Sequence, residues 1–224
     1  MEEHLPGMNR GRIKFMVFFI VALLTVCTVC FYKLSSVFLT QAKIDSNHRR
    51  IQRFFASYKL DTEGVYKLLF SLLPDNTNLA LCMDRTNWKL GISNINILML
   101  SVVYKGLSIP IMWTLLDKRG NSNTKERIEL MNRFIKLFGS SCINYFLADR
   151  EFIGHKWFKY LKENKISFYI RVKENAQIKN RNGKTINITR FFSFLKLNVY
   201  QCNNTIRLVY GVKVYISAVK WIFR

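Results

Sequence analysis

Two apolar runs of this chain end in the same dipeptide: Asn78-Leu-Ala-Leu-Cys-Met-Asp84-Arg85-Thr86 and Ile143-Asn-Tyr-Phe-Leu-Ala-Asp149-Arg150-Glu151-Phe152. Each run has the composition of a buried strand, and a carboxylate at the end of a buried strand is costly unless something compensates it. A divalent metal ion is a common compensator, and two carboxylates that reach one point suit Mg²⁺. Asp84 and Asp149 therefore predict a metal site.

The chain is strongly basic. Its 224 residues include 35 Lys and Arg against 14 Asp and Glu, which gives a net charge of +21. This excess favours phosphate backbones, because neutralising them releases counterions. The basic residues are spread along the whole chain, as they would be around a groove for double-stranded DNA. A ribosomal-type binder or a membrane-surface protein is the alternative that this composition leaves open.

The cysteines indicate a reducing compartment. The chain has five, an odd number, and most lie in apolar runs, which predicts buried reduced thiols in a cytoplasmic protein. Cys27 and Cys30 form a C-x-x-C pattern, but no second Cys/His pair is close enough in sequence to complete a zinc site. We therefore expect no functional role for this pair.

Residues 15–32 carry no charge and reach the threshold length for a membrane-spanning helix. Lys14 and Lys33 make both flanks basic, so the charge asymmetry that orients a span is weak. Thr25 and Thr28 dilute the apolar core, and no small-residue cleavage site follows. We expect a buried helix of a globular domain, with a membrane span as the alternative.

Residues 1–77 predict a helical, basic region that binds DNA. Residues 15–39 favour one long helix or two, and residues 62–73 a short helix that ends before Pro74. Between them, Asp45, Ser46 and Asn47 offer N-caps for a helix that is basic on one side and aromatic on the other. Its candidate DNA-binding residues are Arg49, Arg50 and Arg53, and a solvated surface helix is the alternative.

Residues 78–175 predict an α/β core. The expected strands are residues 79–84, 95–104, 108–116, 143–149 and 167–172. The expected helices are residues 125–138, capped within 121–124, and residues 155–164. The apolar stripe of the first is Ile128, Met131, Ile135 and Phe138. This order is typical of a mixed sheet with flanking helices.

Residues 176–224 predict an all-β segment. Asn180-Arg-Asn-Gly183 is a hairpin signal, and residues 185–188, 199–202, 206–210 and 212–219 are strand-like. The chain ends at Arg224 within strand-like sequence.

The two acids can meet if the first and fourth strands are neighbours in the sheet. In strand order 3-2-1-4-5 the first and fourth strands are neighbours, so Asp84 and Asp149 project at the same edge and can share metal ions. Two such ions stabilise both the attacking and the leaving oxygen of an in-line phosphoryl transfer, and the site needs a third carboxylate. The alternative is that both acids are ion-pair partners of Arg85 and Arg150. Spacing alone leaves both interpretations open.

Several passages resemble the DDE transposases of the IS4 family. They are Asp84-Arg-Thr-Asn-Trp-Lys89, Gly120-Asn-Ser-Asn-Thr-Lys-Glu-Arg127, Leu147-Ala-Asp-Arg-Glu-Phe-Ile-Gly154, Phe168-Tyr-Ile-Arg-Val-Lys-Glu-Asn175 and, upstream, Ile44-Asp-Ser-Asn-His-Arg-Arg-Ile-Gln-Arg-Phe-Phe55. The resemblance implies a ribonuclease H-like fold with an all-β insertion after the fifth strand. It also implies that Asp84 and Asp149 are the first two catalytic, metal-binding acids of the DDE triad, with two Mg²⁺ or Mn²⁺ ions in a complete site.

The family's third acid is missing from the pattern. It lies in a Tyr-x2-Arg-x3-Glu-x6-Lys motif after the β insertion, and the sequence contains no such motif. The glutamates after Asp149 are Glu151, Glu163 and Glu174, and none stands where the family has its catalytic glutamate. The chain therefore resembles a truncated, inactive copy.

The resemblance leads to an expected function and partners. We expect metal-dependent cleavage and strand transfer at the ends of an insertion sequence, by a nucleoid-associated homodimer in a synaptic complex. A basic membrane-associated protein and a non-catalytic DNA-binding remnant are the alternatives. Further candidate DNA contacts, each with a structural alternative, are Arg85, Trp88, Arg150 and Lys173, and His155 is a weaker one.

Overall fold

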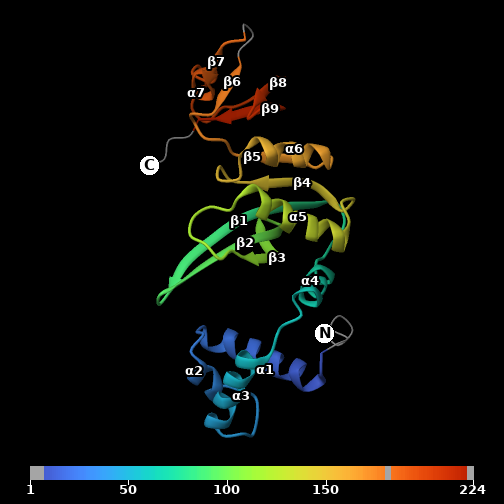
Figure 1. The fold of residues 1–224 in the computed structure, drawn as a ribbon, viewed down its shortest axis with the longest axis vertical. Coiled ribbons are helices and arrows are strands. Elements are labelled where there is room, and N and C mark those ends of the chain that lie inside the picture. The colour runs from blue at the N-terminus through green and yellow to red at the C-terminus, as the bar shows by residue number, and fades with distance from the viewer. Residues whose placement is uncertain (1–7, 180–182, 221–224) are drawn as a thin grey trace. The chain divides into compact units, whose positions relative to one another are not determined.

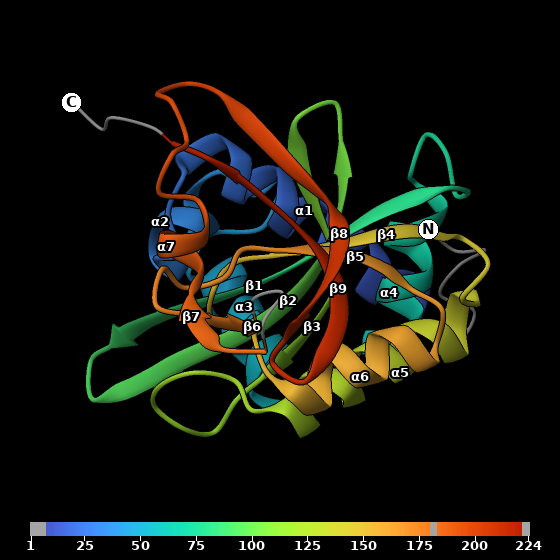
Figure 2. The same ribbon diagram turned by 90° about the horizontal axis from the view of Figure 1, so that it is seen from above.

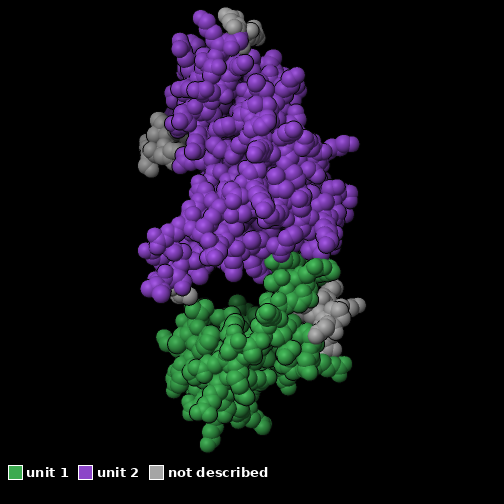
Figure 3. Space-filling view, in the orientation of Figure 1, with its two compact units in different colours: residues 1–73 green, residues 74–224 purple. Residues whose placement is uncertain are grey.

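The computed structural model describes residues 8–179 and 183–220. The chain divides into two compact units, Met1–Leu73 and Pro74–Arg224, which are coloured separately in Figure 3. The expected hairpin signal at residues 180–183 falls largely outside the described residues, as does the end of the chain at residues 221–224. Figure 1 labels the helices and strands of both units.

The first unit is helical. Its helices are α1 (Arg10–Val26), α2 (Phe31–Ser36), α3 (Ile44–Ser57) and α4 (Thr62–Ser71). Its core joins the first three, through Phe15, Ala22, Leu34, Phe38 and Ile51. The apolar run at 15–32 is thus two helices, because Cys27 adopts a left-handed conformation (φ 48°) that ends α1. Among the helices that the structure describes, none combines the length and apolar character that crossing a membrane requires.

Two expectations, on the start of α3 and on the burial of the cysteines, are wrong. Helix α3 begins at Ile44 rather than after the predicted caps, so Asp45 lies in its first turn. Asn47 is buried and binds the preceding loop, since it accepts a hydrogen bond from Thr40 (3.0 Å). The cysteines are all free as expected, but only Cys142 is buried, whereas Cys27, Cys30 and Cys202 are exposed.

The second unit contains the expected mixed sheet. Its strands are β1 (Leu79–Leu90), β2 (Ser93–Tyr104), β3 (Leu107–Leu115), β4 (Ile143–Ala148) and β5 (Ser167–Ile170), in the order β3-β2-β1-β4-β5. The first three pair antiparallel, whereas β4 and β5 are parallel to β1. This ribonuclease H-like arrangement confirms the predicted fold class.

Helices α5 (Thr124–Phe138) and α6 (His155–Glu163) lie side by side on one face of the sheet (Figure 2). A capping box between Asn123 and Glu126 begins α5, as expected. The buried face of α5 differs from the predicted stripe by about one residue, because it includes a charged side chain: its buried residues are Arg127, Leu130, Met131 and Phe134.

The C-terminal part is a second sheet. Its strands are β6 (Gln177–Lys179), β7 (Thr185–Asn187), β8 (Tyr200–Val209) and β9 (Val212–Val219), in the order β7-β6-β8-β9, with the short helix α7 (Ile188–Phe191). Two predicted segments, 199–202 and 206–210, merge into β8, and β6 and α7 were not predicted. The all-β character of the segment is confirmed apart from α7.

Candidate active site

The parallel pairing of β1 with β4 ends just before the two acids. Met83 pairs with Ala148, and the next residues are Asp84 and Asp149. Asp149 therefore lies in the turn after β4, as expected. Asp84 lies within β1, which is a correction: the strand continues to Leu90 because its backbone groups still pair with β2. The sheet thus brings both acids to the point where β1 and β4 separate.

Both carboxylates are exposed, so burial does not create a need for a metal ion, contrary to the premise drawn from the sequence. The Asp84 carboxylate accepts a hydrogen bond from the backbone N–H of Arg85 (2.7 Å). The Asp149 carboxylate lies 3.7 Å from the guanidinium of Arg171, a residue that the sequence interpretation did not single out. The acids are open to solvent and to a large substrate.

The side chain of Arg85 does not pair with the carboxylate of Asp84. Its Nε and Nη2 atoms donate to the two carboxylate oxygens of Glu151, each at 3.2 Å, and Nη2 also donates to Asn121 (3.1 Å). Both partners of this ion pair are largely buried, with side chains 11% and 23% exposed. The pair connects the residue after Asp84 to the turn that carries Asp149.

Arg127 binds the same turn from α5. Its guanidinium donates to the backbone carbonyls of Glu151 (3.1 Å) and Ile153 (3.4 Å), and to the Ser122 hydroxyl (2.9 Å). The group also lies 5.0 Å from the centre of the Phe152 ring. Burial lowers the pKa of Arg127, and Glu151 and Glu126 oppose that shift. A charged residue inside an otherwise apolar helix face was the sequence signal for this role.

The two acids fit the chemistry of a divalent cation, since exposed carboxylate oxygens are hard ligands, but they provide only part of a ligand set. Within residues 8–179 and 183–220, no group of three His, Cys, Asp or Glu side chains could hold a metal ion. Glu151 is occupied by Arg85, Glu163 pairs with Lys159 on α6, and Glu174 is exposed after β5.

The other candidate residues lie in different places. On α3, Arg49 and Arg53 are exposed, whereas Arg50 is partly buried with its guanidinium over the Phe15 ring. Trp88, Arg150 and Lys173 are exposed in the second unit. His155 begins α6, and its ring Nδ1 lies 3.0 Å from the backbone carbonyl of Tyr210, so it contacts the second sheet.

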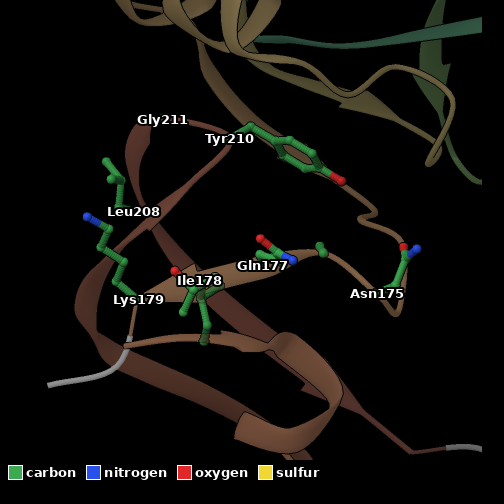
Figure 4. A pocket seen from close by; sticks show the side chains of 9 residues that line it. Asn175, Gln177, Ile178, Lys179, Leu208, Tyr210 and Gly211 are labelled. Carbon is green, nitrogen blue, oxygen red and sulfur yellow. The ribbon is translucent and has the colours of Figure 1, made fainter. Parts of the chain in front are cut away.

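A pocket lies in the second sheet rather than at the acids. Figure 4 shows its lining, which includes Asn175, Gln177, Lys179 and Tyr210. Neither Asp84 nor Asp149 belongs to it. An open, charged strand edge suits a polymer backbone better than an enclosed small ligand.

A family model described as a transposase DDE domain matches residues 75–210, more than half of the chain. The chain belongs to the family of proteins with a transposase DDE domain.

Two solved structures are similar to parts of the chain. One is the HTLV-2 integrase catalytic core domain in complex with magnesium, with 17% identity and a TM-score of 0.33, covering 44% of this chain and 62% of that one. The other is a simian T-cell lymphotropic virus intasome in complex with the PP2A regulatory subunit B56 gamma, with 15% identity and a TM-score of 0.35. It covers 67% of this chain and 51% of that one, so the chain spans less than two thirds of either. No curated protein matches in sequence.

Proposed function

We propose that the chain is the DNA-binding and catalytic part of an IS4-type transposase, in which Asp84 and Asp149 are the first two acids of the DDE triad. The observation that carries this proposal is the register in which Met83 pairs with Ala148, directly before the two acids. Membership of the DDE family supports the reaction class, which is phosphodiester cleavage and strand transfer at the ends of an insertion sequence.

Asp84 and Asp149 would hold Mg²⁺ or Mn²⁺, with two ions in a complete site. When bound, such ions stabilise charge on the oxygens that exchange at phosphorus. The chain's own cations orient the substrate: Arg171 beside Asp149, the adjacent Arg150, and Lys173 are exposed and bind phosphate oxygens.

The proposed partner is double-stranded DNA, both element ends and target. Arg49 and Arg53 on α3 are exposed and bind its backbone, with Arg50 beside them. The proposed assembly is a homodimer in a synaptic complex, associated with the nucleoid in the cytoplasm.

We further propose that these 224 residues bind DNA without cleaving it at an appreciable rate, so that the chain by itself acts as a DNA-binding remnant. Support comes from the two-carboxylate edge, since within the described residues no three His, Cys, Asp or Glu side chains are grouped so that they could hold a metal ion. Metal-assisted phosphoryl transfer depends on exact placement of the ions, and one missing ligand costs orders of magnitude in rate.

Mn²⁺ binding to the purified chain, followed by electron paramagnetic resonance, tests the site. We expect weak, saturable binding that Asp84→Asn and Asp149→Asn each abolish. Asp45→Asn, which changes an exposed acid of the first unit, should leave it unchanged. Unaltered binding in the double Asp84/Asp149 variant would refute the site. Mg²⁺-dependent cleavage of a linear duplex by the chain would refute its inactivity, and would indicate that Glu151, Glu163 or Glu174 completes the ligands.

A further inference from the structure

Strands β1 and β2 extend beyond the rest of the sheet as a two-stranded ribbon (Figure 1). On one side, pairing of β1 with β4 ends at Met83. On the other, pairing of β2 with β3 ends at Ile97. Between these limits β1 and β2 remain paired with each other to Leu90 and Ser93. We call residues 86–96 the β1–β2 ribbon.

The ribbon exposes side chains that a folded core usually covers. Trp88 is 47% exposed, and Ile92 at the tip is fully exposed. Polar residues that can donate or accept hydrogen bonds surround them: the exposed ones are Thr86, Asn87, Lys89, Ser93 and Asn94. Trp88 and Ile92 are therefore accessible to a partner from solvent.

The charge of the ribbon favours a polyanion as that partner. Lys89 is the one charged residue of the ribbon, and no acidic residue occurs anywhere between Asp84 and Asp117. Lysine and asparagine side chains bind phosphate oxygens, and an aromatic ring contacts the methyl group of thymine in the major groove. A two-stranded ribbon also has the width that the major groove of B-DNA admits.

The ribbon is continuous with the candidate active site. Asp84, Thr86 and Trp88 alternate along β1 and therefore share one face of the strand. Leu90 follows Asp84 by six residues, so the ribbon reaches about 20 Å from the acid. That length corresponds to about six base pairs of duplex.

We propose that the β1–β2 ribbon enters the major groove of the duplex about six base pairs from the scissile phosphate, which lies at Asp84 and Asp149. This inference rests on the proposed function, because the acids define where the scissile phosphate lies. Trp88 contacts bases, and Asn87 and Lys89, on the opposite face of β1, contact the backbone.

Photo-crosslinking tests the position of the tip. p-Benzoylphenylalanine replaces Ile92 in one protein and Lys105 in the other, and each is irradiated with a mixed-sequence linear duplex. Lys105 is the matched control, because it is exposed in the turn at the opposite end of β2. We expect DNA adducts from position 92 only, suppressed by the major-groove ligand methyl green and not by the minor-groove ligand distamycin.

Affinity gives a second readout that does not depend on crosslinking. We expect Trp88→Ala and Lys89→Ala each to weaken duplex binding about tenfold at constant salt, and Lys105→Ala to change it less than twofold. All three residues are exposed or half-exposed, so the thermal unfolding of the variants should match that of the parent chain.

The outcomes separate the inference from the proposed function. If the parent chain does not bind duplex DNA at all, the proposed function and the inference both fail. If it binds but positions 92 and 105 crosslink equally and Trp88→Ala binds normally, the ribbon proposal alone fails. Protein–protein adducts from position 92 in place of DNA adducts would assign the ribbon to a second copy of the chain and overturn it too.

Discussion

At the scale of single residues, two arginines hold the turn that carries Asp149. Arg85 binds the Glu151 carboxylate from β1, and Arg127 binds the Glu151 and Ile153 carbonyls from α5. Asp84 and Asp149 are exposed and have few contacts of their own. Their separation therefore depends on these neighbours, which we regard as positioning residues.

Arg85→Gln should weaken Mn²⁺ binding about tenfold or more, because it releases Glu151 and with it the turn that carries Asp149. Electron paramagnetic resonance measures the affinity, and urea unfolding measures stability in parallel. Lys67→Gln is the control, since it removes an ion pair, with Glu63, in the first unit. The exchange Arg85→Glu with Glu151→Arg should restore part of the affinity. Equal affinities of Arg85→Gln and the parent chain would contradict the positioning role.

Arg127→Met should lower the free energy of unfolding by about 3 kcal/mol, because the backbone carbonyls of Ser122, Glu151 and Ile153 and the Ser122 hydroxyl lose their buried donor. Urea unfolding of the whole chain provides the measurement. Lys136→Met makes the same replacement at an exposed position of α5 and should change stability by less than about 0.5 kcal/mol. Equal effects of the two substitutions would show that the Arg127 contacts contribute nothing net.

At the scale of elements, α6 joins the mixed sheet to the second sheet. His155 contacts the Tyr210 carbonyl, the Lys162 ammonium donates to the Lys213 carbonyl (3.1 Å), and the Phe158 ring meets the Tyr210 ring edge-on. Gly211 completes the β8–β9 turn with a positive φ of 75°. A Cβ atom at this glycine would lie 2.6 Å from the His155 ring.

Gly211→Ala should therefore destabilise the chain more than Gly106→Ala. Both glycines have a positive φ, which costs an alanine about 1 kcal/mol, but Gly106 has open space around the added carbon. Urea unfolding of the two variants, and of Gly211→Ala in a His155→Ala background, measures the difference as a double-mutant cycle. If both alanines cost the same, the turn does not pack against α6 as described.

At the scale of the whole molecule, the net positive charge should determine the affinity for the proposed partner, duplex DNA. The net charge of +21 arises from both units, so backbone contacts should dominate the affinity for duplex DNA. We expect the logarithm of the affinity to fall linearly with the logarithm of salt concentration, with a loss of about 10³-fold between 50 and 200 mM if about six phosphates are contacted. Gel-shift titrations on a mixed-sequence duplex give the slope, and an affinity that does not change with salt would refute the proposal.

Local sequence patterns determined most of the architecture. Alternating or continuous apolar residues identify a strand within a few positions, and helix caps are short motifs. The five strands of the mixed sheet, α5 with its capping box and α6 were therefore predictable. The order β3-β2-β1-β4-β5, in which the first and fourth strands are neighbours, was one that the element order allowed, and the structure adopts it. The proximity of Asp84 and Asp149 along neighbouring strands was a consequence of that order.

Only the tertiary structure decided which side chains meet. The partner of Arg85 is Glu151, which lies far along the chain, and no local period identifies such a pair. The extension of β1 past Asp84 depends on hydrogen bonds from β2, so its polar sequence was mistaken for a strand end. Arg127 is buried because loop carbonyls accept its hydrogen bonds. The buried face of α5 therefore includes a charged residue and differs from the apolar stripe that the sequence predicted. Apolar periodicity is a local property of the chain, whereas ion pairs, strand extension and the burial of a charge depend on groups that folding brings together.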